Sequence, residues 1–383
     1  MLGGMRRLLV VVSVTVFADT MLFSAIIPLI PGLADDYDLS KFEAGLLVGA
    51  YGAGAMIGGI PAGLLAVRIG PKRTVVIGLL ALAAATAAFA LGSSPAALGS
   101  ARFVQGIASA VTWSGALAWL TLTTPRERRG QLLGTVFSFA VLGFIVGPAV
   151  GALGELTNIR GTFAVIGLIT LLLAVLTASL PAGPMDVRHP DALRRALHDI
   201  SFLSAVWFSL VPALFFGLLD VLVPLALDSA GWGTIAIAAT FIGAGLVEVA
   251  LAPAIGGLSD RRGRLYPIRA GLLLLAATAL AFAIVTPAFL VAVLVVVGAL
   301  AASAIYTPSI ALVADRAEAS PIPQTLAFGF MNTAWAAGAM IGPTAGGALA
   351  QAIGDPAPYV FCAGLALATL LFVTRTGLTP RPA

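Results

Sequence analysis

Residues 8–31, LLVVVSVTVFADTMLFSAIIPLIP, form an apolar stretch that is long enough to cross a bilayer and carries one acid, Asp19, near its middle. A transmembrane helix needs about 20 mostly apolar residues, and an ionisable group at its centre costs roughly 2.5 to 3.5 kcal/mol to insert. Such residues usually face a bundle interior or a watery cavity, so Asp19 is a candidate for binding a cation or a proton. The alternative is a structural acid that pairs with a neighbouring helix.

The composition is that of a membrane protein. The chain has 383 residues, of which 60% are hydrophobic and 10% charged, and its mean hydropathy is +1.05. Soluble domains contain roughly 45 to 50% apolar residues. The net charge of +4 is better explained by basic loops than by a nucleic-acid surface, so no nucleic-acid partner is expected. The single cysteine, Cys362, excludes an intramolecular disulfide.

Twelve apolar runs are predicted to cross the membrane, in two sets of six. The first set covers residues 8–31, 44–66, 74–92, 97–121, 131–153 and 161–181. The second set covers residues 201–227, 233–255, 267–286, 288–313, 324–350 and 358–374. We therefore expect an all-α integral membrane protein with an N-terminal six-helix bundle (1–181), a polar cytoplasmic linker (182–200) and a C-terminal six-helix bundle (201–383).

The basic residues indicate how the chain is oriented. Of the 21 Lys and Arg residues, all but Lys41, Arg102 and Arg160 fall in loops on the same side as the two termini. By the positive-inside rule both termini are expected in the cytoplasm, with the chain in the cell (inner) membrane. Arg6 and Arg7 also suit a signal peptide, but the apolar run behind them is too long for a signal core, and we expect it to remain as the first span.

The two halves repeat each other at an offset of 193 to 196 residues. The matching pairs are Pro28 and Pro224, Gly63 and Gly256, and Gly147 and Gly342. Parallel six-helix repeats occur in secondary transporters, whose substrate sites lie between the repeats near the middle of the membrane.

A glycine-rich motif appears in both halves. It reads GLLAVRIGPKR from Gly63 to Arg73 and GGLSDRRGR from Gly256 to Arg264. Both copies resemble the G-x-L-a-D-r-x-G-r-k signature of the major facilitator superfamily, which the chain resembles over essentially its whole length. The resemblance implies gating roles for Arg68, Gly70, Asp260, Arg261, Gly263, Arg264 and Asp315.

The first copy departs from the signature, because Val67 stands where the family has Asp. The interaction that holds the cytoplasmic gate shut is therefore expected to be weaker in the first half or to use another partner. The alternative for either loop is a solvated turn that only sets topology.

Arg102-Phe-Val-Gln-Gly106 is similar to the R-x-x-q-G signature in helix 4 of the superfamily. Arg102 and Gln105 share one helix face with Ser109 and Thr112. The functional interpretation is that Arg102 makes proton release from a nearby acid easier. The alternative is that Arg102 extends to the outer membrane interface.

Helices 5 and 11 carry a signature that resembles the one typical of the superfamily's antiporters rather than its symporters. Its residues are Gly143, Gly147, Pro148 and Gly151 in the first half, and Gly338, Gly342, Pro343, Gly346 and Gly347 in the second. Glycines four residues apart form a flat face for close packing, which plain helix packing would also explain.

The first helix motif, FADTMLFSAIIPLIP, is similar to that of the drug:proton antiporters and especially the vesicular monoamine transporters. In that branch, the acid at the position of Asp19 contacts a cationic amine. The helix 11 acid of the monoamine transporters falls on Asn332, so their full proton chemistry does not carry over.

Asp220 or Glu248, the remaining intramembrane acids, could take the missing role, and we favour Asp220. Trp113 and Trp335 are candidates for stacking on a cation.

The sequence thus predicts a proton-coupled antiporter that exports small lipophilic or cationic organic compounds by alternating access. No enzyme or metal-site motif is present, and we expect no cofactor besides the coupling proton, and a monomer in the bilayer. The alternatives are an importer or symporter of a small metabolite and a membrane receptor that transports nothing.

Overall fold

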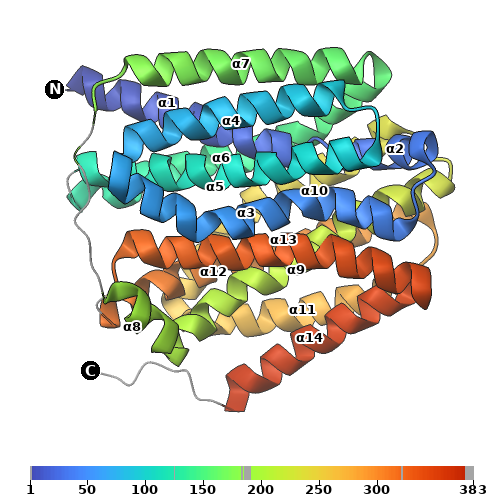
Figure 1. Cartoon of the computed structure of the whole chain (residues 1–383). Helices are drawn as coiled ribbons and strands as arrows, with labels where there is room; N and C mark the ends of the chain where they lie inside the picture. The colour runs from blue at the N-terminus through green and yellow to red at the C-terminus, as the bar shows by residue number, and fades with distance from the viewer. Residues whose placement is uncertain (1, 125, 183, 185–190, 321, 376–383) are drawn as a thin grey trace. The chain divides into compact units, whose positions relative to one another are not determined.

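The structure is a computed structural model that describes residues 2–124, 126–182, 184, 191–320 and 322–375. Every element in these ranges is helical (Figure 1). The first half contains α1 (Leu2–Ser24), the 3-10 helix η1 (Ile27–Leu29), α2 (Ile30–Tyr37), α3 (Lys41–Ile69), α4 (Pro71–Leu91), α5 (Pro95–Thr123), α6 (Arg126–Leu156) and α7 (Ile159–Ser179). The second half contains α8 (Ala192–His198), α9 (Ile200–Ser229), α10 (Thr234–Arg262), α11 (Leu265–Phe282), α12 (Ala288–Ala319), α13 (Gln324–Ala352) and α14 (Pro356–Arg375).

Eleven segments of the described chain are long and apolar enough to cross a membrane. The first of them, Met5–Tyr37, joins α1, η1 and α2. The twelfth predicted span corresponds to α13, which has 29 residues, several glycines and Asn332, and which is not among these eleven segments. The predicted all-α membrane fold is confirmed.

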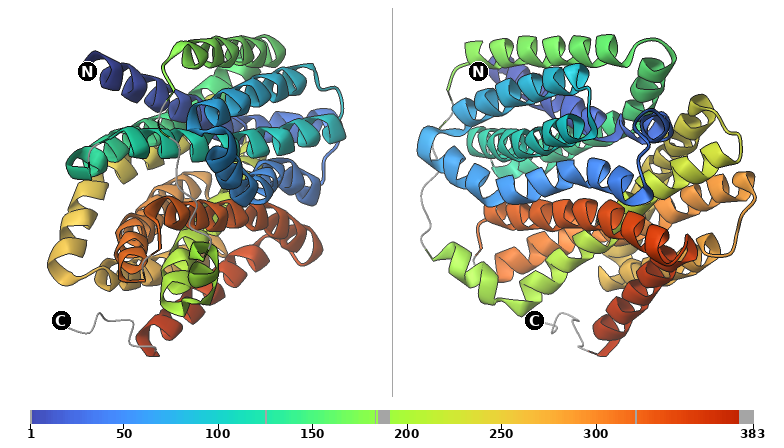
Figure 2. Two further views of the ribbon diagram at one scale, coloured as in Figure 1. Left: turned by 60° about the vertical axis from the view of Figure 1, so that its left-hand side comes forward. Right: turned by 45° about the vertical axis from the view of Figure 1, so that its right-hand side comes forward.

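The chain divides into two compact units, which are described separately. Unit 1 comprises Met1–Asp38 and Ala50–Pro190, and unit 2 comprises Leu39–Gly49 and Asp191–Ala383. Within unit 1, α1 packs against α6, and α4 packs against both α5 and α7. Figure 2 shows α7 running beside α4 in both views. Within unit 2, α9 packs against α13 and α12, and α11 packs against α12 and α14.

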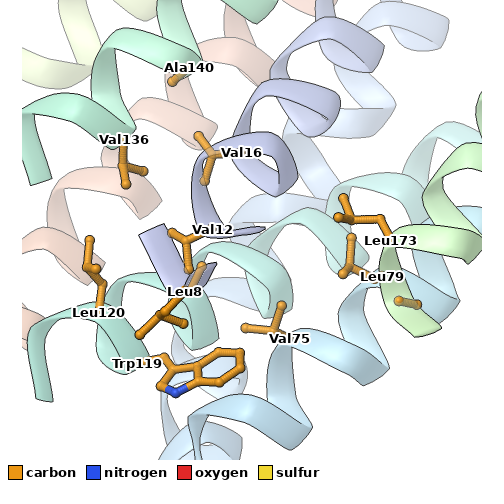
Figure 3. Close-up of a cluster of buried hydrophobic side chains, with 12 residues drawn as sticks. Leu8, Val12, Val16, Val75, Leu79, Trp119, Leu120, Val136, Ala140 and Leu173 are labelled. Carbon is orange, nitrogen blue, oxygen red and sulfur yellow. The ribbon is translucent and has the colours of Figure 1, made fainter. Parts of the chain in front are cut away.

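A buried apolar cluster holds one end of unit 1 together (Figure 3). Leu8, Val12 and Val16 lie four residues apart on α1 and project one stripe of side chains into this cluster. Trp119 of α5 is 1% exposed within it, so this tryptophan is a core residue. The stripe continues along α1 to Asp19, and the same helix face therefore turns Asp19 inward.

Glycines allow α6 to approach α1 closely. A Cβ atom on Gly143, Gly147 or Gly151 would lie 2.0 to 2.3 Å from an atom of α1 or of Ala25, the residue that follows it, and real Cβ atoms essentially never come so close. Thr20 and Ser24 of α1 donate hydrogen bonds across this interface to backbone carbonyls of α6, at 2.8 and 3.0 Å. The two helices are thus packed nearly backbone to backbone.

The same arrangement recurs in unit 2, where α13 faces α9. A Cβ atom on Gly338, Gly342 or Gly346 would lie 2.2 to 2.7 Å from an atom of α9. The glycine signature therefore marks equivalent helix pairs in the two halves.

Glycine is also required in both copies of the basic loop motif. Gly70, between α3 and α4, has φ 87°, and Gly263, between α10 and α11, has φ 84°. Residues with a Cβ atom rarely adopt such values, so each loop turns at its glycine.

Two long basic side chains close the ends of other helices. Lys72 at the start of α4 donates to the carbonyl oxygen of Leu180, which caps the C-terminus of α7. Arg269 of α11 donates to the carbonyl oxygen of Val373 in α14, at 3.4 Å. A cation at a helix C-terminus also complements the helix dipole.

Part of the predicted linker is helical. Residues 191–200 contain the short helix α8 and the side chain of Asp199, which accepts hydrogen bonds from the backbone N–H groups of Ser201 and Phe202 and so caps α9. Ser320, after the end of α12, also donates to Asp199. Residues 183 and 185–190 of the predicted linker lie outside the described residues.

Candidate functional site

The carboxylate of Asp19 lies at the centre of a polar cluster inside unit 1. Its side chain is 2% exposed and accepts three hydrogen bonds. Tyr51 of α3 donates to Oδ1 at 2.9 Å. Ser109 and Trp113 of α5 donate to Oδ2 at 2.8 and 2.7 Å. All three donors are neutral, so they solvate the negative charge without pairing it with a cation in direct contact.

Arg102 of α5 is anchored to the end of α1. It is 1% exposed and donates to the carbonyl oxygens of Leu22 and Phe23, at 3.0 and 3.1 Å. These carbonyls lie in the last turn of α1, where helix carbonyls lack intrahelical partners. Arg102 therefore does not extend to the membrane interface, and that alternative is wrong.

Arg102 also reaches Asp19 indirectly. The carbon atom of its guanidinium group lies 4.7 Å from the centroid of the Tyr51 ring, the geometry of a cation–π contact. The two side chains act on Asp19 through a hydrogen bond in the case of Tyr51 and through charge in the case of Arg102. Arg102 thus contacts the ring of Tyr51, and the hydroxyl of Tyr51 contacts the carboxylate of Asp19.

Gln105 supports Arg102 from the same helix. Its Oε1 accepts a hydrogen bond from Arg102 at 3.2 Å, and its Nε2 donates to Thr86 of α4 at 3.2 Å. Thr112, predicted on the same face, bonds to the carbonyl of Ala108 within α5 and lies against Gly78 of α4. The predicted polar face of α5 is therefore shared between Asp19 and α4.

Small residues bring α3 and α5 close enough for Tyr51 to reach Asp19. A Cβ atom on Gly106 would lie 1.9 Å from the carbonyl oxygen of Tyr51, and one on Gly54 would lie 1.9 Å from that of Phe103. Aromatic rings line the cluster, with Phe23 edge-on to Tyr51 at 5.1 Å and Phe137 at 5.9 Å from Trp113. The site thus combines one carboxylate with several aromatic faces, a combination that suits organic cations.

Sequence reasoning did not single out Tyr51. Tyrosine at this position belongs to no motif and carries no charge. The available signal is the run of small residues after it, because Gly54, Ala55 and Gly58 mark a helix face that packs closely, and Tyr51 lies on the same face.

The other intramembrane candidates lie in unit 2. Asp220 of α9 is 2% exposed, and Glu248 of α10 is half-buried and acts electrostatically on Tyr306 of α12. Asn332 and Trp335 of α13 are half-buried.

The second basic loop forms an ion-pair cluster. Arg264 pairs with Asp260 at the end of α10 and with Asp315 near the end of α12, the latter at 3.2 Å. Burial alone would lower the pKa of Arg264, but its hydrogen bonds to Asp260 and Asp315 outweigh burial and raise it. Arg68 and Arg261 are exposed. The motif thus links α10 to α12 through one arginine.

No group of three or more metal-ligating side chains that could hold a metal ion occurs in the described part of the chain.

Comparison with known families agrees with this architecture. Residues 12–323 match the Major Facilitator Superfamily. The chain belongs to this superfamily. The resemblance that the loop and helix motifs indicated is thereby confirmed.

Curated relatives within the superfamily include drug-resistance proteins. The chain is 29% identical to the Chloramphenicol resistance protein of Streptomyces lividans over 364 residues, which cover 92% of each protein. It is 24% identical to the Quinolone resistance protein NorA of Staphylococcus aureus (strain MRSA252) over 180 residues, 47% of this chain and 46% of that one. These relatives agree with the drug:proton antiporter branch.

Other relatives match a shorter part. The chain is 28% identical to the MFS-type transporter ppzB of Metarhizium rileyi (strain RCEF 4871) over 173 residues, 44% of this chain and 35% of that protein. The chain spans less than half the length of the first three curated relatives that it matches.

The fold is that of solved superfamily transporters. A bacterial homolog to the human lysosomal transporter Spinster, in an inward-facing and occupied conformation, matches with a TM-score of 0.78 and 17% identity, over 98% of both chains. At this identity the likeness shows the fold alone.

Proposed function

We propose that this superfamily member is a proton-coupled antiporter that exports small lipophilic or cationic organic compounds, and that Asp19 binds proton and substrate in turn. The observation that carries the proposal is a buried carboxylate in a membrane-spanning helix whose three hydrogen-bond donors are all neutral. Similarity to a protein named for chloramphenicol resistance over 92% of both chains supports export of small organic compounds.

The chemistry follows from the cost of a buried charge. A carboxylate held away from water is destabilised unless a cation or a proton neutralises it. Either ligand satisfies that need and both use the same oxygens, so binding of one disfavours binding of the other. If Asp19 becomes accessible alternately from the two sides of the membrane, a proton that binds from one side is exchanged for a substrate that binds from the other.

Arg102 affects how readily Asp19 releases its proton, but it does not itself bind the proton or the substrate. Arg102 donates to Leu22, Phe23 and Gln105, and its charge acts on Asp19 while its guanidinium group lies against the Tyr51 ring. That position favours the ionised carboxylate and makes proton release easier.

Asp220 is proposed as the second acid that couples substrate movement to the proton gradient. It is buried in α9, the helix of the second half that corresponds to α1. Glu248 is the alternative for this role.

The test is flux in proteoliposomes under an imposed pH gradient, with tetraphenylphosphonium as the cationic probe and chloramphenicol as the neutral one. Antiport predicts that a probe accumulates against its gradient while protons move the opposite way. Asp19→Asn keeps the size of the side chain but removes its charge and titration, so uphill transport of the cation should fall at least about tenfold and its pH dependence should flatten. Asp220→Asn should still allow exchange but lose uphill transport.

A matched control is Asp228→Asn, the same substitution at an exposed position near the end of α9, which should transport as the wild type does. Uptake of a probe together with protons would favour a symporter. If neither probe is transported, the proposed export of lipophilic or cationic compounds is contradicted. If Asp19→Asn keeps wild-type binding of tetraphenylphosphonium with wild-type pH dependence, Asp19 is structural and the proposal fails.

A further inference from the structure

The two oxygens of Asp19 are not equivalent. A carboxylate offers about four lone-pair positions. Oδ2 accepts from both Ser109 and Trp113, whereas Oδ1 accepts only from Tyr51. Oδ1 is therefore the oxygen with room for a further ligand.

The donors also differ in whether they can reverse. An indole N–H only donates, so Trp113 blocks a proton on the side of Oδ2 that it occupies. A phenol hydroxyl donates or accepts, so Tyr51 can turn its hydrogen away when a proton arrives at Oδ1. Among the three donors, Tyr51 thus stands at the oxygen that can exchange its ligand.

The surroundings fix the ring of Tyr51, and its hydroxyl interacts with both Asp19 and Ser109. The side chain is 2% exposed, with Arg102 against its face at 4.7 Å and Phe23 against it edge-on at 5.1 Å. Its backbone is held against Gly106 of α5. Only rotation about the C–O bond needs to change when the hydrogen bond reverses.

The charged groups near Asp19 are few. Arg102 is the charged residue of α5, and Tyr51 is the titratable group that contacts Asp19 from α3. The other described charged side chains on α1 and on the parts of α3, α6 and α7 in unit 1 lie toward helix ends and are Arg6, Arg7, Arg68, Arg128, Glu155 and Arg160.

We propose that Tyr51 is the positioning residue that holds Asp19 in its ionised form and gives way when a proton reaches Oδ1. This inference rests on the proposed exchange at Asp19. Tyr51 donates to the charged carboxylate, and this hydrogen bond is weaker once Oδ1 carries a proton. A hydrogen bond to a charged group changes the proton affinity of Asp19 roughly 10- to 100-fold, which corresponds to about one to two pH units.

The test measures protonation of Asp19 directly and needs no substrate. Infrared spectra of the purified full-length protein are recorded across a pH series, and the C=O stretch of protonated Asp19 is the band that disappears in Asp19→Asn. Tyr51→Phe keeps the ring and its contact with Arg102 but removes the hydroxyl. The midpoint of the Asp19 band should therefore move upward by about one to two pH units.

Tyr359→Phe is the matched control, since Tyr359 of α14 is also buried and stacked on a phenylalanine, Phe282, at 5.2 Å. In Tyr359→Phe, the pH midpoint of the Asp19 band should equal that of the wild type. Replacement of Tyr51 by 3-fluorotyrosine keeps the ring and the hydroxyl and makes the hydroxyl a stronger donor, so the midpoint of the Asp19 band should move downward. This second variant tests the proposal if Tyr51→Phe does not fold.

The outcomes separate the two proposals. A titrating Asp19 band with the same midpoint in the wild type and in a folded Tyr51 variant overturns the role of Tyr51 and leaves exchange at Asp19 standing. A spectrum in which Asp19→Asn removes no titrating band shows that Asp19 does not exchange protons, and it overturns both.

Discussion

Gly151→Ala tests the close packing of α6 on α1. The added Cβ atom would lie 2.0 Å from the carbonyl oxygen of Ala25, whereas ordinary contact begins at 3.4 Å. The contact atom belongs to the backbone, so no rotamer change relieves it and the helices must separate. Overpacking of this kind costs about 1 to 3 kcal/mol.

Gly134→Ala is the matched control on the same helix. A Cβ atom there meets nothing within 4 Å, and the residue is exposed. Both substitutions gain the same helix propensity of alanine over glycine, about 0.8 to 1 kcal/mol, so their difference isolates the clash. We expect Gly151→Ala to be less stable than Gly134→Ala by about 1 to 3 kcal/mol in unfolding experiments on detergent-solubilised protein.

Gly147 extends the comparison. There the nearest atom is the Ser24 hydroxyl oxygen, at 2.0 Å, followed by the carbonyl oxygen of Met21, at 2.6 Å. Ser24→Ala should therefore rescue part of the loss in Gly147→Ala but none of the loss in Gly151→Ala. Equal stability of Gly151→Ala and Gly134→Ala would refute the inference that α1 and α6 pack backbone to backbone.

Two further predictions concern unit 2. Asp260→Asn should lower the free energy of unfolding by less than about 1 kcal/mol, because the ion pair of Asp260 with Arg264 is exposed. If this cluster is a gate, the same substitution should slow turnover and change the accessibility of engineered cysteines on each side. Full turnover with unchanged accessibility would remove Asp260 from the mechanism. Burial would raise the pKa of Asp199, but hydrogen bonds from Ser320, Phe202 and Ser201 outweigh burial and lower this pKa below the ordinary 3.8. Asp199 therefore stabilises the folded protein at pH values above 3.8, and this stabilisation is lost as the pH falls through the lower pKa of the folded state. Asp199→Ala should therefore cost about 1 kcal/mol near neutral pH, and its deficit relative to the wild type should shrink in acid; a deficit independent of pH would contradict this assignment.

The sequence was sufficient to predict the helices and the interior position of Asp19. Apolar runs determine where a chain can cross a bilayer, and Val12, Val16 and Asp19 share one helix face. The repeat of the glycine signatures likewise reflects a local requirement, because close helix contact needs small residues wherever it occurs.

The direction of Arg102 could not be predicted in the same way. A long side chain near a helix end reaches either the interface or the interior. The decision depends on the carbonyls of Leu22 and Phe23, which come from another helix and are available where α1 ends. Tyr51 was missed for a related reason, since its importance lies in what it touches rather than in a motif.

Capping of α7 by Lys72 bears on the order in which the protein is made. The bond joins the start of α4 to Leu180, so the ribosome has synthesised both partners before it begins α9. Domains generally fold as units during synthesis, with the N-terminal unit first. The Lys72–Leu180 bond can therefore form earlier in synthesis than the bond between Arg269 and Val373, because Val373 is among the last described residues to be made.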